Sequence, residues 1–423
     1  MEKRTGGINW IYATLPINIA LGPVSTFIPL VILELHGTVV DVGVAITLFN
    51  AVTIPAAMFW GFATDRFQSR RPIIAASYFA TAGTLILFLF ASTIYGVEVL
   101  YSIFSLVSSA AATPLNLLVM ETQPKSRWAT AFARFSMVSS IGVTLGLLLG
   151  VAWGDLLPFA MLVIPLAILS FASAVLSFVW IKEPEVPFER EMIVMVRRSF
   201  FERLLFLPVV FLRIPRLFDF RKVIKGLSHE LTRETEILYL SIILFYLASG
   251  IFNTSLVPSL YSAKISKSQI FIVFLSGMAV QTVAFRYVGP YIEKRSLKVS
   301  AVAGLLLRSI SYAFIGLSAY LLSGLLYLGS ALVLYPLAAG VAFVAYYAAS
   351  NVMIFQTLGR TNQGAVLGVY SALVGLATML GSLLSGYVSF YFGYPATFIS
   401  SGVCLMGAAA FTAFLPPTKP EPD

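Results

Sequence analysis

Twelve apolar runs follow one another along this chain, and each is long enough to cross a membrane as a helix. A helix rises about 1.5 Å per residue, so roughly 20 apolar residues span a hydrocarbon core about 30 Å thick. The runs lack the alternation of apolar and polar residues that is typical of a transmembrane β-barrel. We therefore predict an all-α membrane protein with twelve transmembrane helices. The expected spans are 8–33, 39–63, 72–95, 98–121, 129–153, 157–181, 237–261, 267–288, 299–318, 323–350, 364–392 and 396–415.

The composition excludes a soluble globular protein. Of 423 residues, 58% are hydrophobic and 11% are charged, and the mean hydropathy is +0.89, whereas about 25% of the residues in soluble domains are charged. The single cysteine, Cys404, and the two histidines, His36 and His229, show no metal-ligand spacing. The spans also hold no nucleophile or acid/base set. We therefore expect no metal, no cofactor and no enzymatic activity.

The basic residues predict the orientation of the chain. If the N-terminus is cytoplasmic, 24 of the 28 Lys and Arg residues fall on the cytoplasmic side. The positive-inside rule relates such a bias to orientation, so both termini are expected to be cytoplasmic. Topology thus accounts for the net charge of +9, and we expect no nucleic-acid partner. The predicted location is the cell membrane, as a multi-pass protein.

The two halves of the sequence repeat each other. Three motifs of the first half recur in the same order in the second half, displaced by 228 residues at first and by 235 residues later. Ordered repeats of this kind indicate duplicated six-helix units. The paired segments are 22–26 with 250–254, 61–66 with 289–294, and 116–122 with 351–357.

The repeat divides the chain into three parts. Residues 1–181 form an N-terminal six-helix bundle, 182–236 a cytoplasmic linker, and 237–423 a C-terminal six-helix bundle with a short tail. The linker holds eleven basic and nine acidic residues among bulky apolar ones. This pattern is typical of amphipathic segments that lie on the inner face of a membrane and are attracted by anionic lipid. A surface-adsorbed tether without a regulatory role is the alternative.

A short segment rich in charged residues separates the second and third spans. It reads Gly61-Phe-Ala-Thr-Asp65-Arg66-Phe-Gln-Ser-Arg70-Arg71. This loop resembles the signature loop of the major facilitator superfamily, although Gln68-Ser69 stand where that family usually has a glycine. The resemblance covers nearly the whole chain except 182–236. It implies two pseudo-symmetric bundles that bind a small-molecule substrate between them and move it by alternating access, and we expect a monomer.

The same resemblance implies a set of gating contacts at the cytoplasmic end. Gly61 would allow close helix packing, and Asp65 would face the start of the eleventh span in the other half. Arg70 or Arg66 would pair with Glu121 at the inner end of the fourth span. By the repeat, Gly289 and Glu293 would act in the same way against the fifth span. The alternative is that the loop is only a positively charged turn that fixes topology.

Polar residues within the first, fourth, seventh, eighth and tenth spans are the candidates for a substrate cavity. Together they describe a mildly polar cavity rich in aromatic residues, which suits amphiphilic compounds; hydrogen bonds between helices could explain each residue singly. Arg308, near the middle of the ninth span without an acidic partner, is a further candidate for substrate contact or for a structural role. The candidates are Asn18, Thr26, Thr113, Asn116, Asn253, Thr254, Gln281, Arg308, Tyr346 and Asn351.

Acidic residues are absent from the middle of every span. Glu34 and Asp41, which flank the first outer loop, are therefore the candidate proton-coupling residues, and ordinary solvated helix ends are the alternative. We predict a secondary active transporter that exports a small amphiphilic or drug-like compound, with protons as the candidate driving ion. The alternatives are an importer of a small organic solute and a lipid transporter.

Overall fold

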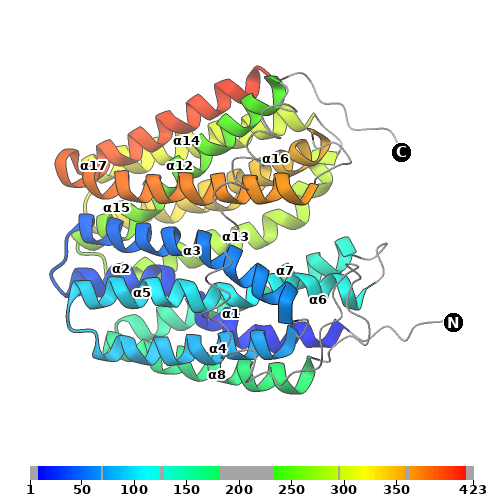
Figure 1. The fold of residues 1–423 in the computed structure, drawn as a ribbon. Helices are drawn as coiled ribbons and strands as arrows, with labels where there is room; N and C mark the ends of the chain where they lie inside the picture. Colours follow the sequence, from blue (N-terminus) through cyan, green and yellow to red (C-terminus); the bar gives the residue numbers. More distant parts are fainter. Residues whose placement is uncertain are drawn as a thin grey trace.

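The structure is a computed structural model of the 423-residue chain, and it describes residues 8–67, 70–123, 128–181, 233–293, 296–357 and 363–415. The regular elements in these ranges are helices (Figure 1). Most of the linker expected at 182–236 lies outside the described residues. The described helices form two groups, one before the linker and one after it.

The N-terminal half begins with a helix that is interrupted. The segment η1 (Ile8–Thr14) continues into α1 (Leu15–Leu21), and α2 (Val24–Glu34) follows after Gly22-Pro23. Proline has no backbone N–H to donate within a helix, which explains why the helical hydrogen bonding is interrupted at this point. The remaining elements are α3 (Val39–Phe67), α4 (Arg70–Leu87), η2 (Phe88–Phe90), α5 (Ile94–Ser108), η3 (Ser109–Ala111), α6 (Ala112–Thr122), α7 (Trp128–Gly154), η5 (Phe159–Leu162) and α8 (Val163–Trp180).

The C-terminal half has the same plan with longer uninterrupted helices. The tenth span is interrupted by η6 (Pro336–Ala342), a π-helical segment that starts at a proline. Such segments are rare, and they replace the regular α-helical hydrogen bonds. The other elements are α12 (Arg233–Ser262), α13 (Lys267–Glu293), α14 (Leu297–Leu321), α15 (Gly324–Tyr335), α16 (Phe343–Thr357) and α17 (Gln363–Ala413).

The described residues contain eleven helices long and apolar enough to cross a membrane, against the twelve predicted. The difference arises in α17, where spans were expected at 364–392 and 396–415. The last candidate span, Ala372–Ala413, has 42 residues, which would reach about 63 Å if straight, twice the thickness of a hydrocarbon core. At Gly393 the backbone leaves the helical region, with φ 81°, and Figure 1 shows α17 turning back there. Twelve crossings stay a prediction.

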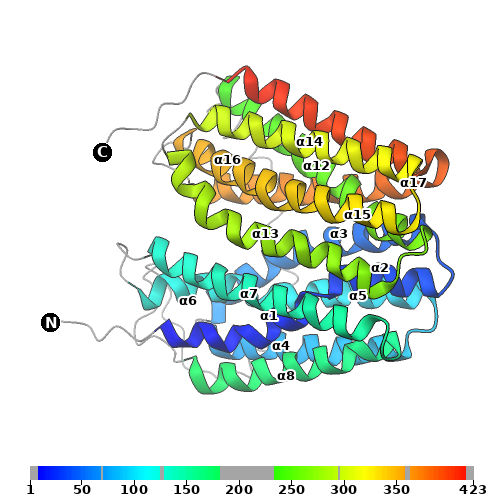
Figure 2. The same ribbon diagram turned by 180° about the vertical axis from the view of Figure 1, so that it is seen from behind.

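The two halves lie side by side, with α1–α8 in one and α12–α17 in the other (Figures 1 and 2). The described ends of the chain lie at the same end of the molecule. We call this the termini end; it also carries the C-terminal ends of α6, α13 and α16. The opposite end carries Glu34, Val39, Lys267 and the start of α15.

Glycine contacts inside the two halves follow the sequence repeat. A Cβ atom on Gly22 would lie 2.5 Å from the Val143 carbonyl oxygen, and one on Gly250 would lie 2.6 Å from the Thr378 carbonyl oxygen. These distances leave room only for glycine. The corresponding second pair of contacts joins Gly146 to the backbone of Ile19 and Gly381 to the backbone of Leu247. Glycines displaced by 228 or 235 residues therefore act alike in each half, where they let two helix backbones approach closely.

Candidate functional site

Polar contacts join the two halves at the opposite end. Lys267 at the start of α13 donates to Glu34 at the end of α2, and its ammonium lies 4.5 Å from the centroid of the Phe159 ring. Both charged side chains are partly shielded, with exposed fractions of 21% for Lys267 and 34% for Glu34. This ion pair therefore ties the first helix of one half to the second helix of the other.

Two further hydrogen bonds cross between the halves beside this ion pair. The Ser266 hydroxyl donates to the Asp155 carboxylate at 2.7 Å, and the Ser268 hydroxyl donates to the Val151 carbonyl oxygen at 2.7 Å. Each bond links the start of α13 to the end of α7 or the loop just after it. The halves are thus held together at this end by an ion pair, by a hydrogen bond to a carboxylate and by a hydrogen bond to a backbone carbonyl.

Small residues bring the helix backbones of the two halves into contact near the opposite end. A Cβ atom on Gly43 of α3 would lie 3.0 Å from the Ser382 carbonyl oxygen and 3.1 Å from Cα of Gly386 in α17. One on Gly154 of α7 would lie 2.8 Å from the Ser268 backbone nitrogen. The opposite end is therefore closed by backbone packing as well as by polar contacts.

At the termini end, the side-chain contacts of Arg70 and Lys298 each stay within one half. Arg70 pairs with Glu121 at 3.0 Å and also donates to the Thr64 carbonyl oxygen at 2.6 Å. In the other half, Lys298 donates to the Leu415 carbonyl oxygen at 2.5 Å. Figures 1 and 2 show the two groups of helices diverging toward this end.

The structure places the predicted gating residues as follows. Of the two arginines considered as partners of Glu121, Arg70 makes the contact, and this pair is buried. Among the described residues, no atom of another element lies within 4 Å of a Cβ built on Gly61, so the described helices do not pack closely there in this conformation. The side chains of Asp65, Arg66, Gly289 and Glu293 lie outside the described residues. The gating roles stay predictions.

The predicted cavity residues fall into three groups by burial. Asn116 and Asn253 are exposed although they lie within apolar helices. A second group is half-buried: Asn18, Thr113, Gln281 and Asn351. A third group is buried inside one bundle: Thr26, Thr254, Arg308 and Tyr346. The members of the third group do not line an open cavity in this conformation.

Ser25 is a polar residue outside the predicted set. It is exposed, while its neighbours Val24 and Thr26 are buried. The displacement of 228 residues pairs it with Asn253, which is exposed between the buried Phe252 and Thr254. The aligned motifs 22–26 and 250–254 contained this position, so combining the repeat with side-chain polarity could have identified it.

Asp41, one of the two candidate coupling residues, is engaged at the start of its own helix. Its carboxylate accepts hydrogen bonds from the Thr38 backbone N–H at 2.6 Å and from the Thr38 hydroxyl at 2.8 Å. This arrangement satisfies donors that the first turn of a helix leaves free. Glu34 differs, since its partner Lys267 belongs to the other half.

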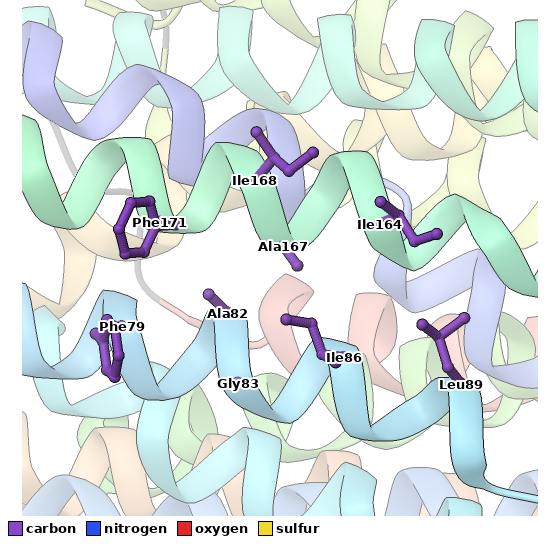
Figure 3. A pocket seen from close by; sticks show the side chains of 9 residues that line it. All are labelled: Phe79, Ala82, Gly83, Ile86, Leu89, Ile164, Ala167, Ile168 and Phe171. Atoms are coloured by element: carbon purple, nitrogen blue, oxygen red, sulfur yellow. The ribbon is translucent and has the colours of Figure 1, made fainter.

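An apolar pocket of about 450 Å³ lies away from the contacts between the halves. Figure 3 shows that its walls are side chains of α4, η2 and α8, all in the N-terminal half. Phe79 and Ile168, on facing walls, are more than half exposed. The pocket therefore belongs to the lipid-facing surface of one bundle. Among the described residues there is no group of His, Cys, Asp and Glu that could hold a metal ion.

Comparisons with known proteins agree with this architecture. The structure resembles a mutant of the nucleoside transporter NupG (TM-score 0.73, 15% identity, 97% of this chain and 99% of that chain). It also resembles a bacterial homolog of the human lysosomal transporter Spinster in an inward-facing, unoccupied conformation (TM-score 0.71, 15% identity, 97% of each chain). A third is a D-xylose–proton symporter (TM-score 0.68, 12% identity, 98% and 97%).

At these identities the likeness shows the fold alone. A comparison with curated protein sequences finds no match. The family model of the Major Facilitator Superfamily matches residues 11–223 and 238–423, which together include nearly the whole chain. The chain therefore belongs to the Major Facilitator Superfamily and is a multi-pass membrane transporter of the secondary type, not an enzyme.

Proposed function

We propose that this transporter works by alternating access and exports small amphiphilic compounds, driven by protons that enter in exchange. The observation that carries the proposal is the position of the contacts between the halves. They gather at the opposite end, whereas the helices diverge at the termini end. A transporter of this kind exchanges such a state for one in which the contacts lie at the other end.

The proposed route runs between α2 and α12, the helices that carry Ser25 and Asn253. These helices pack against each other across the halves. Unpaired polar groups are costly against lipid, so we assign the exposure of Ser25 and Asn253 to the space between the halves. With Asn116, they give this space a few neutral hydrogen-bonding groups among apolar residues, which suits an amphiphile.

Glu34 supplies the proposed link to protons. Protonation removes the charge that Lys267 contacts and so weakens the tie that closes the opposite end. With cytoplasmic termini, the opposite end faces outward, and a proton from outside would favour opening toward outside. A substrate would then leave in the direction from which the proton came, which is the arrangement required for export.

The proposal includes the remaining finer predictions. The termini are cytoplasmic, the protein is a monomer in the plasma membrane, and 182–236 rests on anionic lipid at the inner face. Asp65 and Glu293 form ties between the halves when the termini end closes. The twelve spans and the domain limits at 181 and 237 complete this description.

The test is transport in proteoliposomes that contain the full chain and carry an imposed pH gradient. A panel of fluorescent amphiphiles with positive, neutral and negative head groups is offered to the unmodified protein and to Glu34→Gln. We expect accumulation that collapses with the gradient and is lost in Glu34→Gln, while Asp41→Asn retains it. Uptake in the direction of the proton would show an importer, and exchange of labelled phospholipid between leaflets would show a lipid transporter.

A further inference from the structure

Arg308 is a buried cation in the middle of the C-terminal half. It lies eleven residues from the start of α14, about 16 Å along the helix, and is only 3% exposed. An arginine side chain stays protonated in proteins. Acidic residues described in this half lie at helix ends, at Glu234, Glu236 and Glu293, so none can neutralise it.

Aromatic rings and one hydroxyl surround the guanidinium. Its central carbon lies 4.7 Å from the ring centroid of Phe245, 5.2 Å from that of Tyr312 and 5.4 Å from that of Phe343. The Nε–H donates to the Tyr312 hydroxyl at 2.8 Å. Ring faces attract a cation by about 0.5–2 kcal/mol each, but they do not replace an oxygen acceptor for every N–H.

Two N–H groups of Arg308, both on Nη1, have no acceptor among the described residues. The Nη1 atom is buried and without a hydrogen-bond partner among the described residues. A buried charged donor left unsatisfied is costly, and an anion would remove both the missing hydrogen bond and the missing counter-charge. A single guanidinium charge in a low-dielectric interior favours a monovalent anion over a divalent one, because the cost of desolvation rises steeply with charge.

A stretch of α12 connects this cluster to the space between the halves. Phe245 of α12, whose ring lies 4.7 Å from the guanidinium, accepts a hydrogen bond at its carbonyl oxygen from the Ser249 hydroxyl at 2.7 Å. Asn253, the exposed residue of the proposed route, lies four residues further along α12 and therefore on the same face. The guanidinium is buried in this conformation and lies beside the same stretch of α12 as the route, about two helical turns from Asn253, so the proposed site opens to the route in another conformation of the cycle.

We propose that Arg308 anchors the anionic head group of the transported compound, so that the substrate is an organic monoanion such as an amphiphilic carboxylate. The proposal rests on the proposed function for its route and names the substrate class. Phe245 and Phe343 contact the apolar part next to the head group, while Tyr312 holds the guanidinium in place. A small inorganic anion offers the same chemistry and is the other source that the experiment must separate.

The experiment measures binding to the purified full chain in detergent by isothermal calorimetry and thermal unfolding. The probes are 2-naphthoate, the neutral 2-naphthamide of nearly the same shape, and chloride. We expect naphthoate to bind and to raise the melting temperature, and naphthamide to bind at least tenfold more weakly. Arg308→Met should weaken naphthoate binding by about tenfold or more, the loss of one charge-assisted hydrogen bond. Arg308→Lys, which keeps the charge, should fall between.

The matched control is Arg286→Met, which removes one exposed charge from α13 in the same half and should leave naphthoate binding unchanged. Tyr312→Phe removes only the hydroxyl that orients the guanidinium; it should weaken naphthoate binding severalfold and serves if Arg308→Met does not fold. Equal naphthoate binding by the unmodified protein, Tyr312→Phe and Arg308→Met overturns the proposal. No naphthoate binding to the unmodified protein overturns it as well.

Chloride separates the two sources of the anion. Stabilisation by chloride that depends on Arg308, without binding of naphthoate, assigns the site to an inorganic anion and overturns the assignment to substrate. Competition of chloride with naphthoate at a common site supports the proposal. Because no outcome requires transport, a failure of this site is distinguishable from a failure of the proposed transport cycle.

Discussion

Removing Lys267 should shift the protein away from the conformation described here. The ammonium contacts Glu34 of the other half and the Phe159 ring at 4.5 Å. A partly exposed ion pair is worth about 0.2–1 kcal/mol and an exposed cation–π contact about 0.5–1 kcal/mol. Lys267→Met therefore costs this state about 1–2 kcal/mol relative to the state open at the opposite end, a shift of roughly 5- to 30-fold.

The assay measures distances between spin labels attached at the opposite end, one in each half. Tyr95 at the start of α5 and Leu325 at the start of α15 are 75% and 74% exposed, so both accept labels once Cys404, the only native cysteine, is replaced by alanine. In Lys267→Met, the ratio of the longer-distance population to the shorter-distance population should rise by the factor given above. Glu34→Gln should give a smaller rise, because the contact with Phe159 remains.

Lys264→Met is the matched control, since it removes an exposed lysine three residues away on the same end. It should leave the distances unchanged. In a double-mutant cycle, Glu34→Gln with Lys267→Met should cost less than the sum of the single changes, because both remove the same pair. Unchanged distances in Lys267→Met, or full additivity in the cycle, would refute the conclusion that this ion pair holds the opposite end closed.

Three further predictions concern packing, the buried pair and the route. Gly43→Leu places a side chain against the α17 backbone and should disfavour closure of the opposite end by about 1–3 kcal/mol. The same spin-label assay should show this as a longer distance. Gly83→Leu, whose side chain would enter open space, should leave the distance unchanged. Arg70→Gln should cost about 3–5 kcal/mol of stability because it leaves Glu121 buried and uncompensated, seen as a lower melting temperature. Asn253→Ala should raise KM for the transported amphiphile without lowering the melting temperature.

Each of these three has a contrary result. Equal distances for Gly43→Leu and Gly83→Leu would show that backbone contact does not close the opposite end. A double change of Arg70→Gln with Glu121→Gln that is as damaging as the two single losses added together would show that the residues act independently. An unchanged KM for Asn253→Ala, with a lowered melting temperature, would place this amide in packing alone.

The membrane class and the helical plan were predictable from the sequence because they depend on local properties. Run length and composition suffice to identify spans. In α17 the two expected spans meet at Gly393, where the non-helical backbone reverses the chain without a separating loop. The repeat pairs Gly22 with Gly250, and in the structure each of these glycines lets two helix backbones approach closely within its own half.

Contacts between segments distant in the sequence were harder to predict. Glu34 was selected as an acid near the outer boundary, but its pairing with Lys267 depends on how the two bundles meet, which no local pattern encodes. The polarity of the sequence predicts Thr26, Thr254 and Asn253 as cavity residues, yet helix rotation turns the two threonines into the bundles. The same rotation leaves Asn253 exposed, together with Ser25, which is not among the predicted residues. A rotation of one residue, about 100°, separates the two assignments.

The central claim is that the two ends of the molecule open in alternation. Two label pairs in the bilayer test it directly: Tyr95 with Leu325 at the opposite end, and Met137 on α7 with Tyr287 on α13 toward the termini end, all exposed. Under conditions that lengthen one distance, such as a change of pH, we predict that the other distance shortens. The population open at one end and the population open at the other should then sum to one. Distances that change together, or that stay single-valued under all conditions, would contradict alternating access.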